Sequence, residues 1–328
     1  RIVHATLPLA SKNPLTMIRN IGRLKRLIRR HQVDIVHVRS RAPAWSAWYA
    51  CKATGARYLT TFHGTYGHRG PFKKAYNRIM TRGKRIIAVS QHIAQHLKDI
   101  YSVSETKIKT IHSGFPLKGF DPQQVTPQRL VNQAQAWRLP EEKLIIMIPG
   151  RLSRWKGQAF ILDALSQVSR SDFFCVFVGK AATGSTYGRK LEDMVRDMGL
   201  TEKVRFVGNC EDMPVAYLLA DLVISSSLEP EAFGRVMAEA GAMGRPVLAS
   251  DIGGAQEIVV PGETGWLYQA QNHADFLAHL DTAMNLNIPE RKRMAVTARS
   301  RITAHFSLEQ MQQKTLAVYQ DLLSNDGA

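Results

Sequence analysis

The sequence predicts an α/β protein of two domains, each a parallel sheet covered by helices. Its 328 residues, 45% of them apolar, exceed what one ordinary domain contains. Short β-branched runs alternate with stretches of helical length through most of the chain. Residues 1–120 hold 23 Lys and Arg against three acids, a net charge of +20, whereas the remainder carries −3. Two halves of different charge indicate two domains, and any anionic partner is expected on the first.

The first half shows the alternation of a parallel sheet. Residues 34–38, 57–62 and 85–89 are apolar runs of strand length, and apolar residues recur every three or four positions across 17–30. Residues 1–5 also have the composition of a strand. Nucleotide-binding folds usually carry a glycine-rich turn after their first strand, and no such turn precedes the helix at 17–30. We therefore expect the N-terminal domain to lack its first strand and its glycine-rich loop.

The second half repeats this organisation. Residues 121–142 are polar and rich in Gln, which indicates a linker with a short helix. We expect an N-terminal domain over 1–120, a C-terminal Rossmann-like domain over 143–305, and a C-terminal helix within 306–328 that crosses back to the N-terminal domain. The strands expected in the second domain are 144–148, 173–178, 204–207, 222–224 and 246–249.

Composition excludes several classes of protein. Cys51, Cys175 and Cys210 are far apart in the chain, so neither a disulfide framework nor a cysteine zinc site is indicated. No apolar run approaches the roughly 20 residues that span a bilayer, and no charged-then-apolar leader opens the chain. These features predict a cytoplasmic protein, with peripheral attachment to the inner membrane as a further expectation.

Two cations follow the strand predicted at 144–148. Arg151 and Lys156 lie in the turn before an apolar stretch of helical periodicity. Ligands of open α/β sheets bind at the carboxyl ends of the strands, where the next helix also offers free amides to an anion. Arg151 can bind phosphate oxygens with two hydrogen bonds while Lys156 adds a point charge. The alternative is a solvated basic turn.

Two carboxylates follow the strand predicted at 222–224. Glu231 precedes a helix expected to start near Phe233 or Gly234, and Glu239 lies further along that helix. Capping of the helix is the simpler account of Glu231. Glu239 has apolar neighbours and needs hydrogen-bond donors, which the two hydroxyls of a ribose would supply.

With these motifs, the sequence resembles glycosyltransferase family 4, the retaining enzymes of the GT-B fold. The resemblance covers nearly the whole chain. It implies two Rossmann-like, doubly wound domains facing a cleft. The matching elements are the Arg151 and Lys156 pair, the E-x7-E spacing of Glu231 and Glu239, and residues 250–254 with Glu257, Gly262 and Gly265.

The resemblance also implies the roles of individual residues. Arg151 and Lys156 would bind the diphosphate, Glu239 the ribose, and Glu231 with the amides of Phe233 and Gly234 the donor sugar and its phosphate. His63 matches the histidine that many members place near the transferred sugar, although a lone His after a strand is otherwise more often structural. The catalytic set is therefore His63, Glu231, Arg151 and Lys156. The donor-binding set is Arg151, Lys156, Glu231, Phe233, Gly234, Arg235 and Glu239.

Departures from the family pattern remove no charge that the chemistry needs. Residues 113–116 replace a common Asn-Gly-x-Asp turn, and Gln256 stands where a proline is frequent. No Asp-x-Asp element is present, which favours a metal-independent reaction. His92 and His96 have the spacing of zinc ligands on a helix, but no third ligand is evident, so no metal site and no cofactor are expected.

We expect the acceptor to lie on the basic first domain. Residues 69–85 contain seven Lys and Arg and no acid, interleaved with apolar residues, which predicts a basic amphipathic helix; 17–30 is similar, and Trp45, Trp48 and Tyr49 add aromatics. The alternative is a solvated helix face. An anionic membrane and a lipid-linked acceptor fit this surface. The sequence around residues 40–45 and 62–65 is similar to that of alphaproteobacterial lipopolysaccharide core mannosyltransferases.

Other functions remain open at this point. The predicted donor is GDP-mannose or a UDP-sugar, used by a retaining hexosyltransferase of cell-envelope biosynthesis. A charge of +20 also suits a nucleic-acid-binding or membrane-binding protein without transferase activity, although no nucleic-acid reading motif is present and Glu231 and Glu239 would be unexplained. Another GT-B enzyme, such as a UDP-sugar epimerase, is the remaining alternative.

Overall fold

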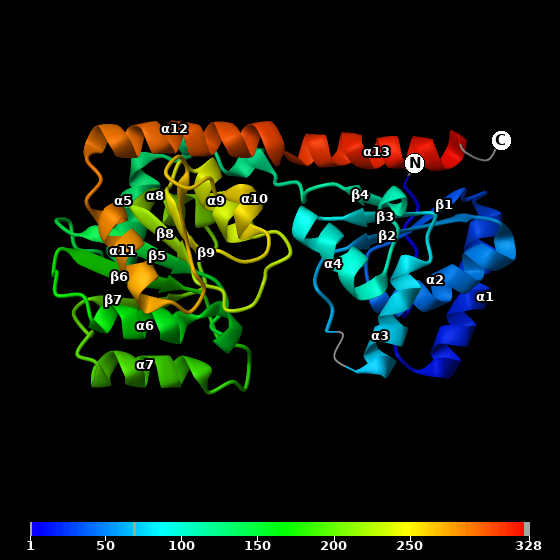
Figure 1. The fold of residues 1–328 in the computed structure, drawn as a ribbon, viewed down its shortest axis with the longest axis horizontal. Coiled ribbons are helices and arrows are strands. Elements are labelled where there is room, and N and C mark those ends of the chain that lie inside the picture. Colours follow the sequence, from blue (N-terminus) through cyan, green and yellow to red (C-terminus); the bar gives the residue numbers. More distant parts are fainter. Residues whose placement is uncertain (1, 68–69, 325–328) are drawn as a thin grey trace. The chain divides into compact units, whose positions relative to one another are not determined.

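The computed structural model describes residues 2–67 and 70–324. The chain forms two compact units, one of residues 2–113 and 311–324, the other of residues 114–310 (Figure 1). Each unit contains one parallel sheet. Helix α13 (Leu308–Ser324) begins in the second unit and continues into the first.

The first unit contains the expected strands. Residues 35–38, 57–62 and 85–88 are strands, as predicted, and a short fourth strand follows. Its strands are β1 (Ile35–Val38), β2 (Arg57–Phe62), β3 (Arg85–Ala88) and β4 (Ile108–Thr110). Its helices, besides part of α13, are α1 (Pro14–Arg30), α2 (Arg41–Thr54), α3 (Pro71–Asn77), α4 (Gln91–Tyr101) and the 3₁₀ helices η1 (Arg78–Thr81) and η2 (Glu105–Lys107).

Alternation along β2 assigns the two faces of the first sheet, whose strand order is β1-β2-β3-β4. Leu59 points to one face, where Val318 and Leu322 of α13 cover it. Tyr58 and Thr60 point to the other face. There the Tyr58 hydroxyl donates to a carbonyl of α2, and the Thr60 hydroxyl donates to the Met80 carbonyl at 2.6 Å.

The second unit holds the second βα series, and all five predicted strands are confirmed. Its strands are β5 (Leu144–Pro149), β6 (Phe173–Val178), β7 (Val204–Gly208), β8 (Leu222–Ser225), β9 (Val247–Ser250) and β10 (Gly265–Tyr268). Its α-helices are α5 (Pro127–Trp137), α6 (Gln158–Ser166), α7 (Tyr187–Asp197), α8 (Met213–Leu219), α9 (Arg235–Ala242), α10 (Ala255–Ile258), α11 (His273–Met284) and α12 (Ile288–His305). Its 3₁₀ helices are η3 (Leu117–Gly119), η4 (Pro122–Gln124) and η5 (Arg154–Lys156).

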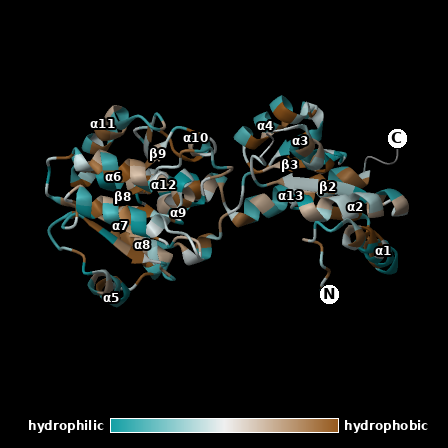
Figure 2. Cartoon of the chain, turned by 90° about the horizontal axis from the view of Figure 1, so that it is seen from below, coloured by the Kyte–Doolittle hydropathy of each residue, from teal (hydrophilic) through white to brown (hydrophobic). Residues whose placement is uncertain are grey.

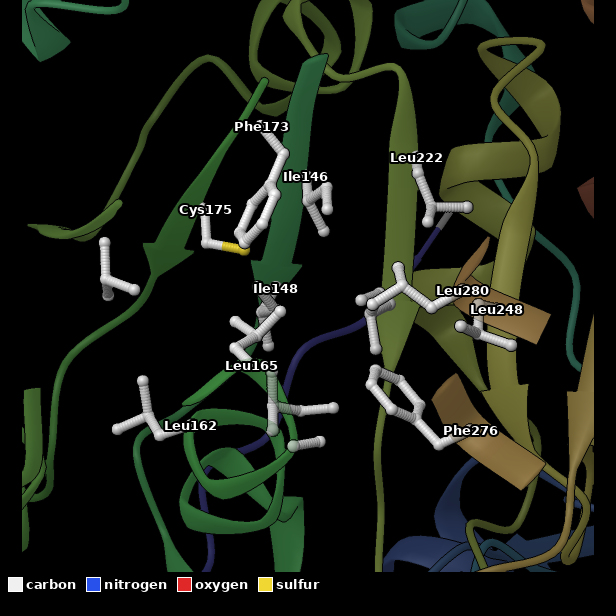
Figure 3. Close-up of a cluster of buried hydrophobic side chains, with 14 of the residues drawn as sticks. Ile146, Ile148, Leu162, Leu165, Phe173, Cys175, Leu222, Leu248, Phe276 and Leu280 are labelled. Carbon is white, nitrogen blue, oxygen red and sulfur yellow. The ribbon is translucent and has the colours of Figure 1, made fainter. Parts of the chain in front are cut away.

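The second sheet has the order β10-β9-β8-β5-β6-β7, which is the doubly wound order of a dinucleotide-binding fold. Apolar residues cover both of its faces, as a parallel sheet requires. Ile146 and Ile148 of β5 point to a core formed with α6 and α11, shown in Figure 3. Ile145 and Met147 point to the opposite core, formed with α8, α9 and α12.

Residues 121–142 are not a free connection between the units. The division falls after Ser113, and residues 114–142 belong to the second unit. Phe115 and Trp137 are 2% and 7% exposed and lie in the same core cluster. The polar composition of this segment reflects the exposed side of α5, whose last residue, Trp137, is anchored in the core.

Two expectations about the first unit are wrong. Residues 2–5 form no strand: Ile2 is 97% exposed and Val3 63%, so these apolar side chains have no sheet neighbour to pack against. The expected helix over 69–85 is also shorter. It consists of α3 followed by η1 and a bend at residues 83–84, because the chain enters β3 at Arg85. Arg69 lies outside the described residues.

The first helix carries much of the unit's positive charge. The Asn13 side chain caps α1 by accepting from the amides of Leu15 and Thr16, and Pro14 occupies the first helical turn. Figure 2 shows hydrophilic residues along the outer side of α1. None of the helices within the described residues combines the length and the apolar character needed to cross a bilayer.

Candidate functional site

The second sheet has a topological switch point between β5 and β8. The chain runs from β5 to β6 on one side and from β8 to β9 on the other, although β5 and β8 are paired neighbours. The loops that follow β5 and β8 therefore start side by side at the carboxyl edge of the sheet. Ligands of doubly wound sheets bind at this position.

Lys156 and Glu231 meet at this switch point. The Lys156 ammonium lies 2.6 Å from Oε1 of Glu231, and the two side chains are only 15% and 14% exposed. The Ser227 hydroxyl donates to the same carboxylate oxygen. The Glu231 side chain caps no helix amide here, so the capping account gives way to a half-buried ion pair between the two loops.

Close backbone contact fixes the loop that carries Lys156. Gly157 has φ of +71°, and a Cβ there would lie 2.0 Å from the Ser226 carbonyl oxygen. The Leu228 amide donates to the Trp155 carbonyl at 2.7 Å, and the Ser226 hydroxyl donates to the Lys156 carbonyl at 2.8 Å. These contacts position the Lys156 backbone against the loop after β8.

The paired glycines after β9 hold the other side of that loop. The Gly254 amide donates to the Glu231 carbonyl at 2.8 Å. An added Cβ would lie 2.5 Å from the Glu231 carbonyl oxygen at Gly253 and 2.3 Å from the Phe233 carbonyl oxygen at Gly254. The Gly-Gly sequence is therefore required because two backbones approach closely, and it determines where Glu231 lies.

Arg151 is exposed at the same edge of the sheet. Its guanidinium has no hydrogen-bond partner among the described residues, while its carbonyl accepts from the buried side chain of Gln158 at 3.0 Å. The amides of Phe233 and Gly234, just before α9, likewise have no acceptor within the described part of the chain. A guanidinium, an ammonium and free amides thus stand at the ends of neighbouring strands, an arrangement suited to an anion.

Glu239 is 7% exposed and already has two donors from the chain. The Tyr217 hydroxyl donates to Oε2 at 2.9 Å, and Nε of Arg235 donates to Oε1 at 2.6 Å. Burial, together with the charge of Glu239, raises the pKa of Tyr217, which keeps this hydroxyl protonated as a donor. The expectation that Glu239 depends on ribose hydroxyls for its donors is therefore wrong. A ligand can therefore donate only to the lone pairs of the Glu239 carboxylate that Tyr217 and Arg235 leave unused.

His63 follows β2 in the first unit and lines a pocket of about 300 Å³. Nε of Arg39 donates to Nε2 of His63 at 3.1 Å, so this ring nitrogen is unprotonated. Desolvation and the Arg39 charge both lower the pKa of His63. His63 is accordingly a neutral imidazole at neutral pH.

His37 lies in the wall of the same pocket. Its two ring nitrogens are 2.8 Å from the Tyr319 hydroxyl and 2.6 Å from the Thr61 hydroxyl. Burial, with smaller contributions from Arg39 and His63, lowers the pKa of His37 to about 4. The neutral ring thus holds α13 to β2 through two hydrogen bonds.

Several residues of these sites are not evident in the sequence motifs. Ser227 and Tyr217 contact the two carboxylates, and Arg39 contacts His63. Arg39 follows the end of β1 directly, so its position at the carboxyl edge of the first sheet could have indicated it. Tyr217 has no such signal, because only the packing of α8 against α9 brings it to Glu239.

A doubly wound parallel sheet with cations and an acid at its switch point, joined in one chain to a second parallel-sheet unit, defines a GT-B glycosyltransferase. Two family models match the chain: "Glycosyltransferase Family 4" over residues 1–118 and "Glycosyl transferases group 1" over residues 132–301. The chain belongs to glycosyltransferase family 4 and is a transferase enzyme. The alternatives of a binding protein without transferase activity and of an epimerase are thereby set aside.

Relatives of known structure agree with this assignment. A glycosyltransferase from Rickettsia africae ESF-5 is 36% identical, with a TM-score of 0.92 over 99% of this chain and 86% of that one. The Anabaena protein HepE, solved in complex with UDP, has a TM-score of 0.84 at 22% identity, over 92% of this chain and 82% of its own. That identity supports a shared fold.

Curated relatives are more distant. The lipopolysaccharide 1,2-N-acetylglucosaminetransferase of Salmonella typhimurium is 32% identical over 191 residues, which are 56% of this chain and 50% of that protein. Across eight such relatives, the chain spans between 47% and 80% of their length.

Removal of the Glu239 carboxylate should destabilise the second unit. Glu239→Ala leaves the buried Tyr217 hydroxyl without an acceptor, and we expect a loss of about 2 kcal/mol of unfolding free energy, measured by urea denaturation. Arg235→Ala should cost less than about 1 kcal/mol, because its side chain is 75% exposed. Adding Tyr217→Phe to Glu239→Ala should recover part of the loss. If the double variant recovered no unfolding free energy, the unpaired Tyr217 hydroxyl would not be the cause of the loss.

Acid should destabilise the first unit through His37. The pKa of His37 is lower in the folded chain, about 4, than its ordinary 6.5, so the folded state binds fewer protons between these values. Stability is therefore present above pH 6.5 and falls, by on the order of 2 kcal/mol, as pH drops towards 4. Hydrogen exchange of β2 amides in urea at pH 7.5 and 4.5 measures this change.

His37→Gln should reduce that pH dependence, because the amide forms hydrogen bonds but does not titrate. His31→Gln, at an exposed position, is the matched control and should leave it unchanged. Equal pH dependence in wild type and His37→Gln would show that other groups cause the acid sensitivity.

Proposed function

We propose that the protein is a retaining hexosyltransferase that uses a nucleoside diphosphate-sugar and acts in cell-envelope biosynthesis. The observation that carries this proposal is the half-buried pair of Lys156 and Glu231 at the switch point of the second sheet. A cation beside a carboxylate at this edge can bind a phosphate while the acid faces the sugar attached to it. Family membership supplies the reaction class, and the geometry supports this assignment of roles.

The leaving group determines what the site must do. Cleavage of the bond from the anomeric carbon to the diphosphate oxygen develops negative charge on the diphosphate. In our proposal Arg151, Lys156 and the amides of Phe233 and Gly234 meet that charge. Hydrogen bonds to charged groups contribute roughly 1.5 to 3 kcal/mol each. Because the Arg151 guanidinium and these amides are otherwise unengaged, the diphosphate displaces no internal contact of theirs.

The acceptor would attack from the face that the leaving group departs from. Its hydroxyl oxygen forms the new bond to the anomeric carbon, and its proton passes to an oxygen of the departing diphosphate. In this scheme Glu231, held by Lys156 and Ser227, faces the donor sugar. The Glu239 carboxylate, oriented by the donor Arg235, accepts from a ribose hydroxyl. The neutral imidazole of His63 would contact the transferred sugar as a hydrogen-bond donor through its protonated ring nitrogen.

The donor base and sugar belong to the proposal. HepE shares the fold and is solved with UDP, which supports a UDP-sugar, while GDP-mannose is the donor suggested by the similarity to core mannosyltransferases. The name of the Salmonella relative supports lipopolysaccharide as the product class. We therefore propose a glycan or lipid-linked acceptor of the lipopolysaccharide core, bound at the basic first unit, and a cytoplasmic enzyme at the inner membrane.

The surface of the first unit supports attachment to an anionic membrane. Leu15 and Ile18 of α1 are 66% and 64% exposed, and the same helix carries six Lys and Arg and no acid. Phe72 of α3 is 89% exposed and precedes Lys73 and Lys74. Exposed apolar side chains among cations suit the boundary between lipid headgroups and acyl chains.

Loss of the Lys156 charge should slow transfer strongly while the protein remains folded. Lys156→Met is expected to lower kcat about 100-fold, because a cation that stabilises the departing diphosphate is removed. Arg154→Met removes a cation two residues away, on the same 3₁₀ helix, and should change kcat less than about threefold. Transfer is measured with GDP-mannose, UDP-glucose and UDP-N-acetylglucosamine, and nucleotide binding by thermal shift. Equal loss in the two variants would contradict the role of Lys156.

Membrane binding should depend on the basic face of α1. Replacing Arg26, Arg29 and Arg30 by Gln should weaken binding to phosphatidylglycerol vesicles about 100-fold, since each cation contributes about 1 kcal/mol near an anionic surface. The matched control replaces Arg189, Lys190 and Lys292, exposed cations of the second unit, and should bind as wild type does. Flotation measures the binding, with duplex DNA as competitor. Preference for DNA over vesicles would contradict the membrane proposal.

A further inference from the structure

A second pocket of the first unit, of about 560 Å³, is lined by residues other than His63. Three cations line it: Lys12 before α1, Arg41 at the start of α2, and Lys73 of α3. Its lining contains no Asp or Glu, and none of these three cations forms an ion pair within residues 2–67 and 70–324. Three unpaired positive charges around one cavity favour an anion there.

Internal contacts orient the central cation. Nη1 of Arg41 donates to Oδ1 of Asn77 at 3.2 Å, and its guanidinium lies 4.4 Å from the ring centroid of Tyr66. Asn77 is fully buried and is itself held by hydrogen bonds to Tyr101 and to the Gly67 carbonyl. Arg41 is therefore held in one orientation with donors left over, which an anion can use without a large entropy cost.

The start of α2 adds donors to the same pocket. Ser40 is the N-cap residue, its side chain accepts no helix amide, and the first turn contains no acid. Ser40 and Ala42 line the pocket with Arg41. The amides of this first turn therefore complement the three cations.

Aromatic rings form the rest of the lining. Tyr66, Phe72 and Tyr76 contribute to the wall, and Phe72 is largely exposed. The Tyr76 hydroxyl is buried and has no hydrogen-bond partner among the described residues. Its ring packs against Trp45 at 5.8 Å between centroids. Aromatic faces suit a sugar ring, whose C–H faces are apolar.

We infer that this pocket binds a phosphorylated saccharide, with the phosphate on Arg41, Lys12 and Lys73 and the sugar ring against Tyr66 and Tyr76. A phosphate monoester carries close to two negative charges at neutral pH, which three cations neutralise better than they match a single carboxylate. As a statement about the acceptor, this inference rests on the proposed function, because it gives the acceptor class as a phosphorylated glycan. As a statement about binding, it stands on the first unit alone.

Calorimetric titration of the full chain with glucose 6-phosphate tests the inference. Saturating UDP and GDP are present, so that the cations of the second unit are occupied. Glucose 6-phosphate should bind at least tenfold more tightly than either glucose or glucuronate. Binding of glucuronate as tight as that of the phosphate, or no difference from glucose, would overturn the inference.

Variants locate the binding. Arg41→Gln and Lys73→Gln should each weaken it about tenfold, as loss of a charged hydrogen bond does. The Lys73 side chain forms no hydrogen bond or ion pair within the described residues, so its variant tests the pocket even if Arg41→Gln perturbs packing. Lys107→Gln removes an exposed cation of η2 outside the pocket and should change affinity less than twofold. An equal effect of Lys107→Gln would attribute binding to diffuse charge and overturn the site.

The two proposals fail separately. UDP and GDP binding of Arg41→Gln and Lys73→Gln should equal that of wild type, whereas Lys156→Met should lose nucleotide binding and keep glucose 6-phosphate binding. If only Lys156→Met lost glucose 6-phosphate binding, the phosphate would bind at the second unit. That result would overturn this inference and leave the proposed donor site intact.

Discussion

The pairing of β5 with β8 is the constraint on which the proposed donor site depends. These strands lie far apart in the sequence and send their connections to opposite sides of the sheet. The loops that follow these two paired strands therefore start side by side at the carboxyl edge of the sheet. The Lys156–Glu231 contact at 2.6 Å follows from that topology, and the glycines at 157, 253 and 254 allow the backbones to approach closely enough to make it.

Half-buried charge makes this pair useful for chemistry. At 15% and 14% exposure, Lys156 and Glu231 have lost most of their hydration, and each stabilises the other's charge. In the proposed reaction, the diphosphate meets an ammonium that is already desolvated and oriented, so little reorganisation remains to be done. Ser227 adds a hydrogen bond to the Glu231 carboxylate, which would keep it in place if a phosphate competed for Lys156.

The first unit uses its charge differently. Its cations far outnumber its acids, so within the described residues most have no acid to pair with, whereas Arg85 pairs with Asp321 of α13. Unpaired cations repel one another and cost stability, which the packing of Leu59 and Ile87 against α13 offsets. This repulsion is consistent with a surface that binds anions, because the cations of α1, Arg39 and the pocket of Arg41 keep hydrogen-bond donors available.

Alternation and spacing in the sequence determined most of the fold. Strands such as 57–62 and 173–178 were predicted to the residue, because strands buried on both faces are short apolar runs with clear ends. The short β4, of only three residues, had too little pattern to be predicted. The strand predicted over the first residues is wrong for a different reason: residues 2–5 have the composition of a strand but no neighbouring strand to pair with.

For the site, the sequence determined which charges follow which strands, and hence Arg151, Lys156, Glu231 and Glu239 as candidates. Only the tertiary structure decided their partners, because hydrogen bonds across loops depend on packing between segments distant in the chain. Glu239 shows the limit: its apolar neighbours correctly indicated a buried carboxylate, but its donor Tyr217 comes from a helix 22 residues earlier. The pocket of Arg41 also depends on folding, since its lining comes from segments between residues 12 and 77 that no spacing relates.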